Sequence, residues 1–279
     1  MPLPHTSSLV YPIAPDSLPP RPLDQPPYLV TFANSPEDLD AVLRLRFDVF
    51  NLELREGFAE SYQTGRDEDA FDRVMHHLMV IKMPEREVVG TYRLQTAAMA
   101  AANLGFYTAT EFDLSTLPAA LTSQAIEIGR ACISRPHRNR LVLFMLWKGL
   151  AAYMTHNQLR YLFGCCSLTS QDPAEGWRAY RHLAAENHLH QEYSFPALPG
   201  YECEEPALAG RPEDEAPASA SDAKSPIPQL FRTYLRYGAK VCGPPVIDRQ
   251  FGTIDFTMLL DVQQLTPAVF EAYFQSTPI

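Results

Sequence analysis

The chain has 279 residues, of which 46% are hydrophobic, so it can bury a full core within one elaborate domain. Its formal net charge of -10 argues against a general nucleic-acid-binding protein. Five cysteines without CxxC spacing favour a reduced, cytosolic protein over a disulfide-stabilised one.

The N-terminus lacks the basic-then-apolar pattern of a secretory signal. Lys148 interrupts the longest apolar run before it reaches membrane-spanning length. We therefore expect a cytoplasmic protein, with peripheral attachment to the inner face of a membrane as an alternative.

Residues 1–27 contain nine prolines, so we expect an extended arm without regular structure. Residues 28–279 then form a single domain. A segment at about 196–226 is rich in Pro, Ala, Ser and acidic residues, which predicts a mobile acidic insertion in that domain.

A short β-type run at Tyr28–Phe32 precedes a helix that Ser35 caps, with Asp38 as the acid three residues later. The apolar stripe of this helix is Leu39, Val42, Leu43, Phe47 and Phe50. Arg46 falls inside the stripe. It either extends to the rim of the core or meets a buried carboxylate.

Residues 53–72 are acidic and loop-like, and two β-type runs at 77–83 and 88–96 predict a hairpin. Residues 106–121 contain a helical turn and a proline loop. Residues 124–168 then follow a strand–helix–strand pattern, with the helix at 141–154, which implies parallel pairing of the two strands.

Two charges, Glu127 and Arg130, interrupt the first of these strands, where buried charges are costly unless they are paired or used. Strict alternation places them on opposite faces, whereas a β-bulge brings both to one face and splays the strand from its neighbour. Gly129 and Ala131 are small, so a ligand can approach the backbone and its N–H groups can stabilise an oxyanion. The alternative is a buried ion pair that only holds the sheet together.

No acidic residue lies between Ile128 and Gln171, a stretch that contains six basic residues: Arg130, Arg135, Arg138, Arg140, Lys148 and Arg160. This basic island either binds an anionic partner or is an ordinary solvated turn.

Beyond residue 168, Asp172 caps a helix that runs to about residue 187. A short helix at 227–237, strands at 239–242 and 255–260, and a terminal helix at 267–274 complete the chain. The histidines lack a completing ligand, so we predict no metal site.

Phosphate-binding, dinucleotide-binding, serine-hydrolase and zinc-protease motifs are absent from the sequence. Four of the cysteines, Cys132, Cys165, Cys166 and Cys242, lie in apolar strands and are expected in the core. Direct group transfer without a covalent enzyme intermediate is then the simplest enzymatic interpretation.

Four segments together resemble one family: EIGRACISRPHRN, LFMLWKGLAAYM, RYLFGCCSL and YGAKVCGPPVIDRQFGTIDF. They are similar to the L-ornithine Nα-acyltransferases of ornithine-lipid synthesis. These belong to the GNAT superfamily and are related to N-acyl amino acid synthases and acyl-homoserine-lactone synthases. The resemblance covers about residues 28–261 and implies an α+β fold with a mixed, splayed central β-sheet flanked by helices.

The implied activity is transfer of a fatty acyl group, typically 3-hydroxyacyl, from acyl carrier protein to the α-amine of an amino acid such as ornithine. The product is an N-acyl amino acid or lyso-ornithine lipid. The carrier's 4'-phosphopantetheine arm holds the donor, and no tightly bound cofactor is expected. The alternatives are an acyl-homoserine-lactone synthase, a CoA-dependent N-acetyltransferase and a non-enzymatic acyl- or carrier-binding protein.

The resemblance also implies roles for particular residues. It implies catalytic roles for Glu127 and Arg130, with Glu127 accepting a proton from the incoming α-ammonium. It implies substrate-binding roles for Arg46, Phe50, Asp69, Asp72 and Arg93. Asp69 or Asp72 would hold a cationic side chain such as ornithine's.

One departure from the GNAT pattern concerns the acyl donor. CoA-dependent members usually place a glycine-containing Q/R-x-x-G-x-G/A turn before the helix, where N–H groups bind pyrophosphate. The corresponding residues 138–143, RNRLVL, contain no glycine. This favours a carrier-protein donor, for which we predict binding by Gly129, Ala131, Arg138 and Arg140.

Overall fold

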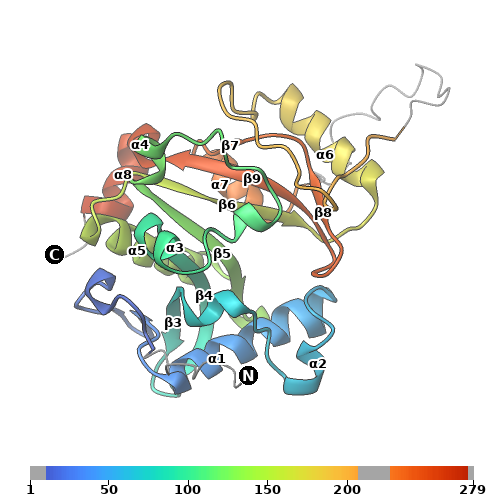
Figure 1. The fold of residues 1–279 in the computed structure, drawn as a ribbon. Helices are drawn as coiled ribbons and strands as arrows, with labels where there is room; N and C mark the ends of the chain where they lie inside the picture. Colours follow the sequence, from blue (N-terminus) through green and yellow to red (C-terminus); the bar gives the residue numbers. More distant parts are fainter. Residues whose placement is uncertain (1–10, 207–226, 276–279) are drawn as a thin grey trace, which may run out of the picture.

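The computed structural model describes residues 11–206 and 227–275, which contain one nine-stranded sheet (Figure 1). The order across it is β1-β2-β3-β4-β5-β6-β9-β7, and β8 also pairs with β9. The strands are β1 (Leu23–Gln25), β2 (Tyr28–Phe32), β3 (His76–Lys82), β4 (Glu87–Thr96), β5 (Ala125–Ile133), β6 (Tyr161–Leu168), β7 (Lys240–Val241), β8 (Val246–Asp248) and β9 (Thr253–Asp261).

Eight helices in the described residues lie between or after these strands along the chain. They are α1 (Pro36–Phe47), α2 (Ser61–Thr64), α3 (Ala97–Ala102), α4 (Ala119–Thr122), α5 (Arg140–His156), α6 (Pro173–Ala185), α7 (Gln229–Arg236) and α8 (Pro267–Phe270). As predicted, Ser35 caps α1 by accepting a hydrogen bond from the Asp38 N–H. A π-helical turn, Asp48–Leu54, continues α1.

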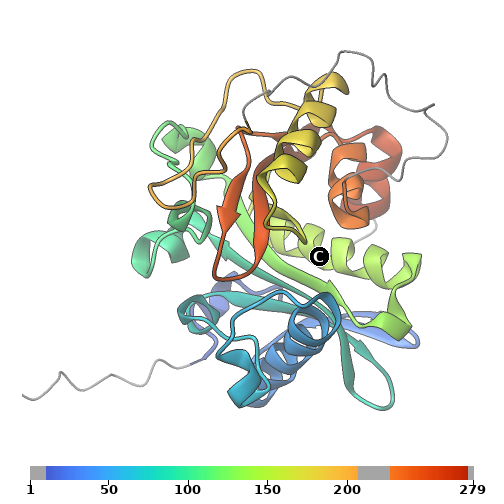
Figure 2. The same cartoon turned by 90° about the vertical axis from the view of Figure 1, so that its right-hand side faces the viewer.

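Helices cover both faces of the sheet, and β3 shows why. Leu78 and Val80 point into the large core beneath α5, whereas the alternate residues Met79 and Ile81 pack with Val42 of α1. Figure 2 shows α5, α6 and α7 on one side and the segment bearing α3 and α4 on the other. The mixed sheet flanked by helices confirms the predicted fold class.

Helix α5 is apolar nearly all round because it is covered on both sides. One side packs on the sheet, with Leu146 and Leu150 in the same core as β2–β4. On the other, Trp147 contacts the rings of Tyr237 and Tyr273, with centroids 4.8 and 5.8 Å away. The C-terminal segment therefore completes the burial of this helix.

The splay predicted for the centre of the sheet is confirmed. Strands β5 and β6 form the parallel pair, but their ladder contains only three residue pairs and ends at Glu127 with Phe163. A register shift in the β4–β5 ladder places Arg130 and Ala131 opposite the single residue Tyr92. Arg130 has a φ of 46°, so the bulge, which was predicted between Glu127 and Arg130, lies at Arg130 itself.

The proline-rich arm and the acidic insertion both differ from their predictions. Within the proline-rich arm, Leu23–Gln25 form the edge strand β1, because pairing with β2 satisfies their backbone groups despite the neighbouring prolines. Residues 1–10 lie outside the described residues. So do residues 207–226 of the acidic insertion, whereas Ala197 and Glu202 make isolated β-bridges.

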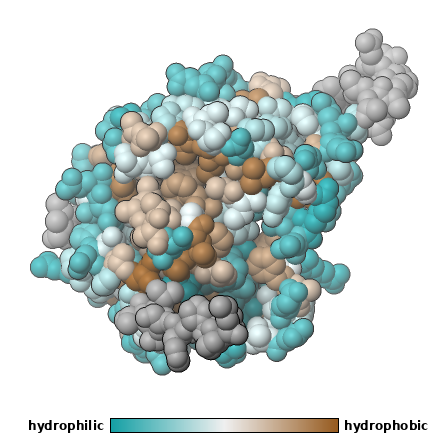
Figure 3. All heavy atoms as spheres, in the orientation of Figure 1, coloured by the Kyte–Doolittle hydropathy of each residue, from teal (hydrophilic) through white to brown (hydrophobic). Residues whose placement is uncertain are grey.

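Among the described residues, no helix is long and apolar enough to cross a membrane. Apolar residues nevertheless gather on the face over α3 and its neighbours (Figure 3). Leu104, which follows α3, is 51% exposed.

The end of the β5–β6 ladder depends on Gly164, which has a φ of +155°. A Cβ atom there would lie 2.1 Å from the Ile128 carbonyl oxygen. We expect Gly164→Ala to lower the free energy of unfolding by about 2–3 kcal/mol, measured by urea denaturation.

Gly129→Ala is the matched control on the facing strand, because a Cβ at Gly129 meets no atom within 4 Å. Its unfolding free energy should change by less than about 1 kcal/mol. Equal unfolding midpoints for the two variants would contradict the steric argument.

Candidate active site

Three arginines and three aspartates form a buried ion cluster beside the bulge. Arg46 of α1 is fully buried and donates from Nε to Asp67 Oδ2 at 2.6 Å and from Nη1 to Asp72 Oδ1 at 2.6 Å. Of the two interpretations of Arg46, the buried-carboxylate one is therefore confirmed.

The other two arginines come from the paired strands β4 and β5. Arg93 Nη1 donates to Asp69 Oδ1 at 2.5 Å and to Asp72 Oδ1 at 2.9 Å. Arg130 Nη2 lies 3.3 Å from Asp69 Oδ2, and its Nε lies 3.6 Å from Asp67 Oδ2. The cluster thus joins α1, β4 and β5 around the bulge with balanced charge.

Burial alone would raise the pKa of Asp72, but the Arg46 and Arg93 guanidiniums hold it well below its usual range. Burial would also raise the pKa of Asp69, but the nearby Arg93 and Arg130 guanidiniums outweigh this effect and lower it. Both carboxylates are therefore charged at neutral pH and already accept hydrogen bonds from arginine. Neither lines the cavities described below.

Aromatic rings surround the Arg130 guanidinium. Its Cζ lies 4.1 Å from the ring centroid of Phe251, 4.9 Å from that of Tyr107 and 5.6 Å from that of Phe58. These cation–π contacts hold the planar group at the mouth of the splay without neutralising it.

Glu127 extends from β5 into a cage of donors. Its carboxylate accepts the backbone N–H groups of Thr108 at 2.6 Å and Tyr107 at 2.9 Å, and the Gln95 Nε2 amide at 2.7 Å. The side chain is 2% exposed. Glu127 thereby fixes the segment after α3 against the sheet, besides lining the cavity where chemistry is expected.

Two adjoining cavities occupy the splay between β5 and β6. The smaller has about 450 Å³ of empty space, including space open to solvent. We call it the polar cavity because its lining includes Glu127, Arg130, Thr108, Ser167 and Asp255, although apolar groups line it as well. The larger has about 970 Å³ of empty space, counted in the same way, and mostly apolar walls. These include Phe50, Ala131, Leu230, Phe231, Tyr234 and Met258. Gly129, Arg130 and Cys165 belong to both linings, so a molecule in one cavity can touch a molecule in the other.

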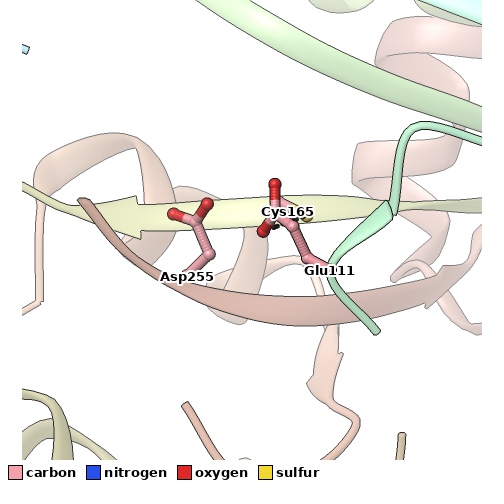
Figure 4. Close-up of side chains that lie close together, drawn as sticks. All are labelled: Glu111, Cys165 and Asp255. Carbon is pink, nitrogen blue, oxygen red and sulfur yellow. Dashed lines mark hydrogen bonds between the residues drawn. The ribbon is translucent and has the colours of Figure 1, made fainter. Parts of the chain in front are cut away.

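A third group of ionisable residues, which the sequence analysis missed, lies at the polar cavity. Glu111, Cys165 and Asp255 bring their ligand atoms within 4.8 Å of one another (Figure 4). Asp255 is a buried charge inside strand β9. A charge within an apolar strand is also what identified Glu127. Asp255 was missed because the strand was predicted to begin at residue 255, where a charged residue can face solvent.

These three residues are also where a metal ion would be sought among the described residues. Burial raises the pKa of the Cys165 thiol well above its usual value, and Glu111 and Asp255 raise it further. A protonated thiol is a poor ligand, so the donor set suits a metal ion poorly.

The predicted donor-binding residues fall into two places. Gly129 and Ala131 line the cleft, while Arg138 and Arg140 are exposed near the start of α5. The basic island does not form one surface. Arg130 and Lys148 are buried, and Arg160 binds Asp261 at the other end of β6. Only three residues at its centre, Arg135, Arg138 and Arg140, are exposed next to one another. Arg130 on β5, Lys148 on α5 and Arg160 before β6 lie elsewhere in the fold.

Known proteins resemble this chain over most of its length. A family model described as an acetyltransferase (GNAT) domain matches residues 45–148. The chain is 31% identical to the L-ornithine N(alpha)-acyltransferase of Brucella abortus over 256 residues, covering 88% of each chain. It is 32% identical to the protein of the same name from Rhodobacter capsulatus, covering 88% of this chain and 94% of that one. The crystal structure of the AHL synthase LasI matches with a TM-score of 0.48 and 12% identity, covering 90% and 97% of the two chains.

The ion cluster generates a stability prediction. Arg46→Met should lower the free energy of unfolding by about 3–5 kcal/mol, because it leaves Asp67 and Asp72 buried without their main partner. Chemical denaturation measures this loss.

Arg44→Met on the same helix is the control, since Arg44 and its partner Asp40 are both substantially exposed. It should cost less than about 1 kcal/mol. A comparable loss in both variants would show that the buried cluster contributes no more than a surface ion pair.

Proposed function

The chain belongs to the family of GNAT acyltransferases that contains the L-ornithine Nα-acyltransferases, and from this premise we propose that it acylates the α-amine of ornithine. The donor would be a fatty acyl group, typically 3-hydroxyacyl, carried by the 4'-phosphopantetheine arm of acyl carrier protein. The observation that supports this proposal best is the splay, which joins a polar cavity to an apolar one at Gly129 and Arg130.

The two cavities suit two different substrates. The apolar walls of the larger one fit an acyl chain and a pantetheine arm, whose burial the hydrophobic effect favours. The charged side chains that line the smaller one, Glu127, Arg130 and Asp255, are complementary to the ammonium and carboxylate groups of an amino acid. The reacting atoms then meet at β5 beyond Glu127, where the strand has no ladder partner on β6.

In the proposed reaction, Glu127 accepts a proton from the α-ammonium, directly or through a water molecule. The freed amine attacks the thioester carbonyl carbon. The oxyanion that forms on the carbonyl oxygen is stabilised by the β5 backbone N–H groups of residues 127–131. The C–N bond forms first, and the tetrahedral intermediate then collapses with cleavage of the C–S bond. The departing thiolate takes the surplus proton of the attacking nitrogen, which leaves the amide and a free thiol, and Glu127 returns the first proton to solvent. Arg130 and Arg93 orient the amino acid's carboxylate or position Glu127.

The start of α5 bears on the choice of donor. The Asn139 side chain accepts the Val142 N–H at 3.0 Å, so one of the N–H groups that would face a CoA pyrophosphate is already used. Together with the glycine-free turn, this supports a carrier protein over CoA. Exposed Arg138 and Arg140 fit the acidic surface of such carriers.

Mass spectrometry of lipid extracts from cells that express the protein tests the activity. We expect a new N-acyl-ornithine, whose amphiphilic character fits a cytoplasmic enzyme attached peripherally to the inner face of the membrane. An acyl-homoserine lactone would instead indicate the S-adenosylmethionine-dependent alternative, and N-acetylated products the CoA-dependent one. Acyl carrier binding without any product would indicate a binding protein.

Glu127→Gln should lower turnover by roughly 10²–10⁴-fold with purified protein, because it removes the proton acceptor. The exposed acid Glu175 supplies the control, and Glu175→Gln should retain full activity. Melting temperature must be measured alongside. Because Glu127 anchors Tyr107 and Thr108, inactivity with a large fall in melting temperature would favour a purely structural role.

Replacing both Arg138 and Arg140 with Glu should raise the KM for acyl carrier protein roughly tenfold at low salt and less at high salt. Arg181→Glu on α6, also exposed, should leave that KM unchanged. A KM insensitive to the double replacement would place carrier docking elsewhere.

A further inference from the structure

We propose that Glu111 and Asp255 form the subsite for the second, side-chain ammonium of a diamino acid acceptor. The inference rests on the proposed function and deepens it, because this subsite would select ornithine over amino acids with neutral side chains. It replaces the sequence-based assignment to Asp69 or Asp72, whose oxygens already bind Arg46, Arg93 and Arg130.

Asp255 of β9 lines the polar cavity together with Cys165 and Ser167 of β6, and Glu111 adjoins Asp255 and Cys165 from outside the lining. Asp255 of β9 pairs with Ser167 of β6, and Thr257 pairs with Cys165, so these side chains share one face of the sheet. Glu111, from the segment that crosses this face, approaches Cys165 with Oε2 4.0 Å from its Sγ. Figure 4 shows the three side chains gathered on neighbouring segments.

The two carboxyls are buried without a matching cation. Glu111 is 1% and Asp255 4% exposed. Glu111 Oε1 and Asp255 Oδ1, like the hydroxyls of Thr253 and Thr257, have no hydrogen-bond partner within the part of the chain that the structure describes. Buried polar groups are normally satisfied, so these oxygens indicate a missing donor, and Asp255 places one of them at the wall of the polar cavity.

The electrostatics favour a cation. Burial raises the pKa of Glu111 well above its usual value, and the neighbouring charges of Asp255 and Asp248 raise it further. Burial likewise raises the pKa of Asp255. A bound ammonium would supply the positive charge that these groups lack and three N–H donors for the unsatisfied oxygens.

The subsite is placed to read the far end of an amino acid whose near end reacts. Thr108 connects the two ends, since its N–H donates to Glu127 while its hydroxyl lies 3.8 Å from Cys165 Sγ. Arg130 lines the same cavity, and its Nε has no hydrogen-bond acceptor among the described residues. An α-carboxylate at Arg130, an α-amine at Glu127 and a side-chain ammonium at Glu111 and Asp255 give three-point recognition of a diamino acid.

The test compares ornithine with norvaline, which has the same carbon chain but lacks the side-chain amine, as acceptors of acyl groups from acyl carrier protein. Wild-type protein should strongly prefer ornithine. Glu111→Gln and Asp255→Asn should each lower kcat/KM for ornithine by about 10- to 100-fold, because a charged partner of the ammonium is lost. With norvaline each variant should stay within about twofold of wild type. Asp113→Asn, two residues beyond Glu111 and outside the cavity, should behave as wild type.

Other outcomes separate this inference from the proposed function. Equal losses with ornithine and norvaline would make the pair a proton acceptor or a structural element and overturn the subsite. So would an undiminished preference for ornithine in both variants. If the wild type acylates no amino acid, the proposed function fails, and calorimetry still decides the subsite: ornithine binding that norvaline does not reproduce and both variants lose would support it, whereas no binding would overturn it.

A zinc titration by calorimetry with zinc chloride supplies the last arm. One tightly bound zinc ion per wild-type chain, lost in both variants, would assign Glu111, Cys165 and Asp255 to a metal centre and overturn the proposal. Unchanged melting temperatures of the two variants should accompany the expected kinetic result. Neither carboxyl has a cationic partner in the described ranges of the chain, so an amide removes no ion pair and can keep the hydrogen bond between the two side chains.

Discussion

The parallel ladder between β5 and β6 ends after three residue pairs, and the rest of the site depends on that break. Two local features produce it. Arg130 adopts a left-handed backbone conformation that creates the bulge on β5, and Gly164 lets the Ile128 carbonyl approach β6 where a side chain would collide. Without the break, the sheet would close and Gly129, Arg130 and Cys165 could not line two adjoining cavities.

The site contains two clusters of charged residues close together, one with balanced charge and one without a cation among the described residues. Around the bulge, three arginines match three aspartates, so a large desolvation cost is offset by short ion pairs and α1 is fixed to β4 and β5. By contrast, Asp255 of β9 and Glu111, which lies between α3 and α4, face each other without a cation from the described part of the chain to match them. A completed network is suited to holding a backbone conformation, whereas an incomplete one is suited to binding a charged ligand.

Sequence patterns were most informative where one residue violated its surroundings. Arg46 in an apolar helical stripe, and Glu127 and Arg130 in an apolar strand, indicated the centre of the site because burying such charges is costly. The same logic missed Glu111, which lies in an irregular segment without a pattern to violate, and Asp67, which lies in an acidic stretch where one more acid is unremarked. The position of Asp255 at the expected start of a strand concealed its burial.

The sequence by itself determined most of the helices and strands, the parallel pairing of β5 and β6, the cap of α1 and the residues whose charge had to be accommodated. Periodicity, capping and composition are local properties, so the chain displays them without being folded. Only the tertiary structure decided which charge meets which. Arg46 and Asp72 lie 26 residues apart, and Glu111 and Asp255 are much farther apart, yet each pair meets. Such pairings depend on how strands β4, β5, β6 and β9 are laid side by side, and no local pattern encodes that arrangement.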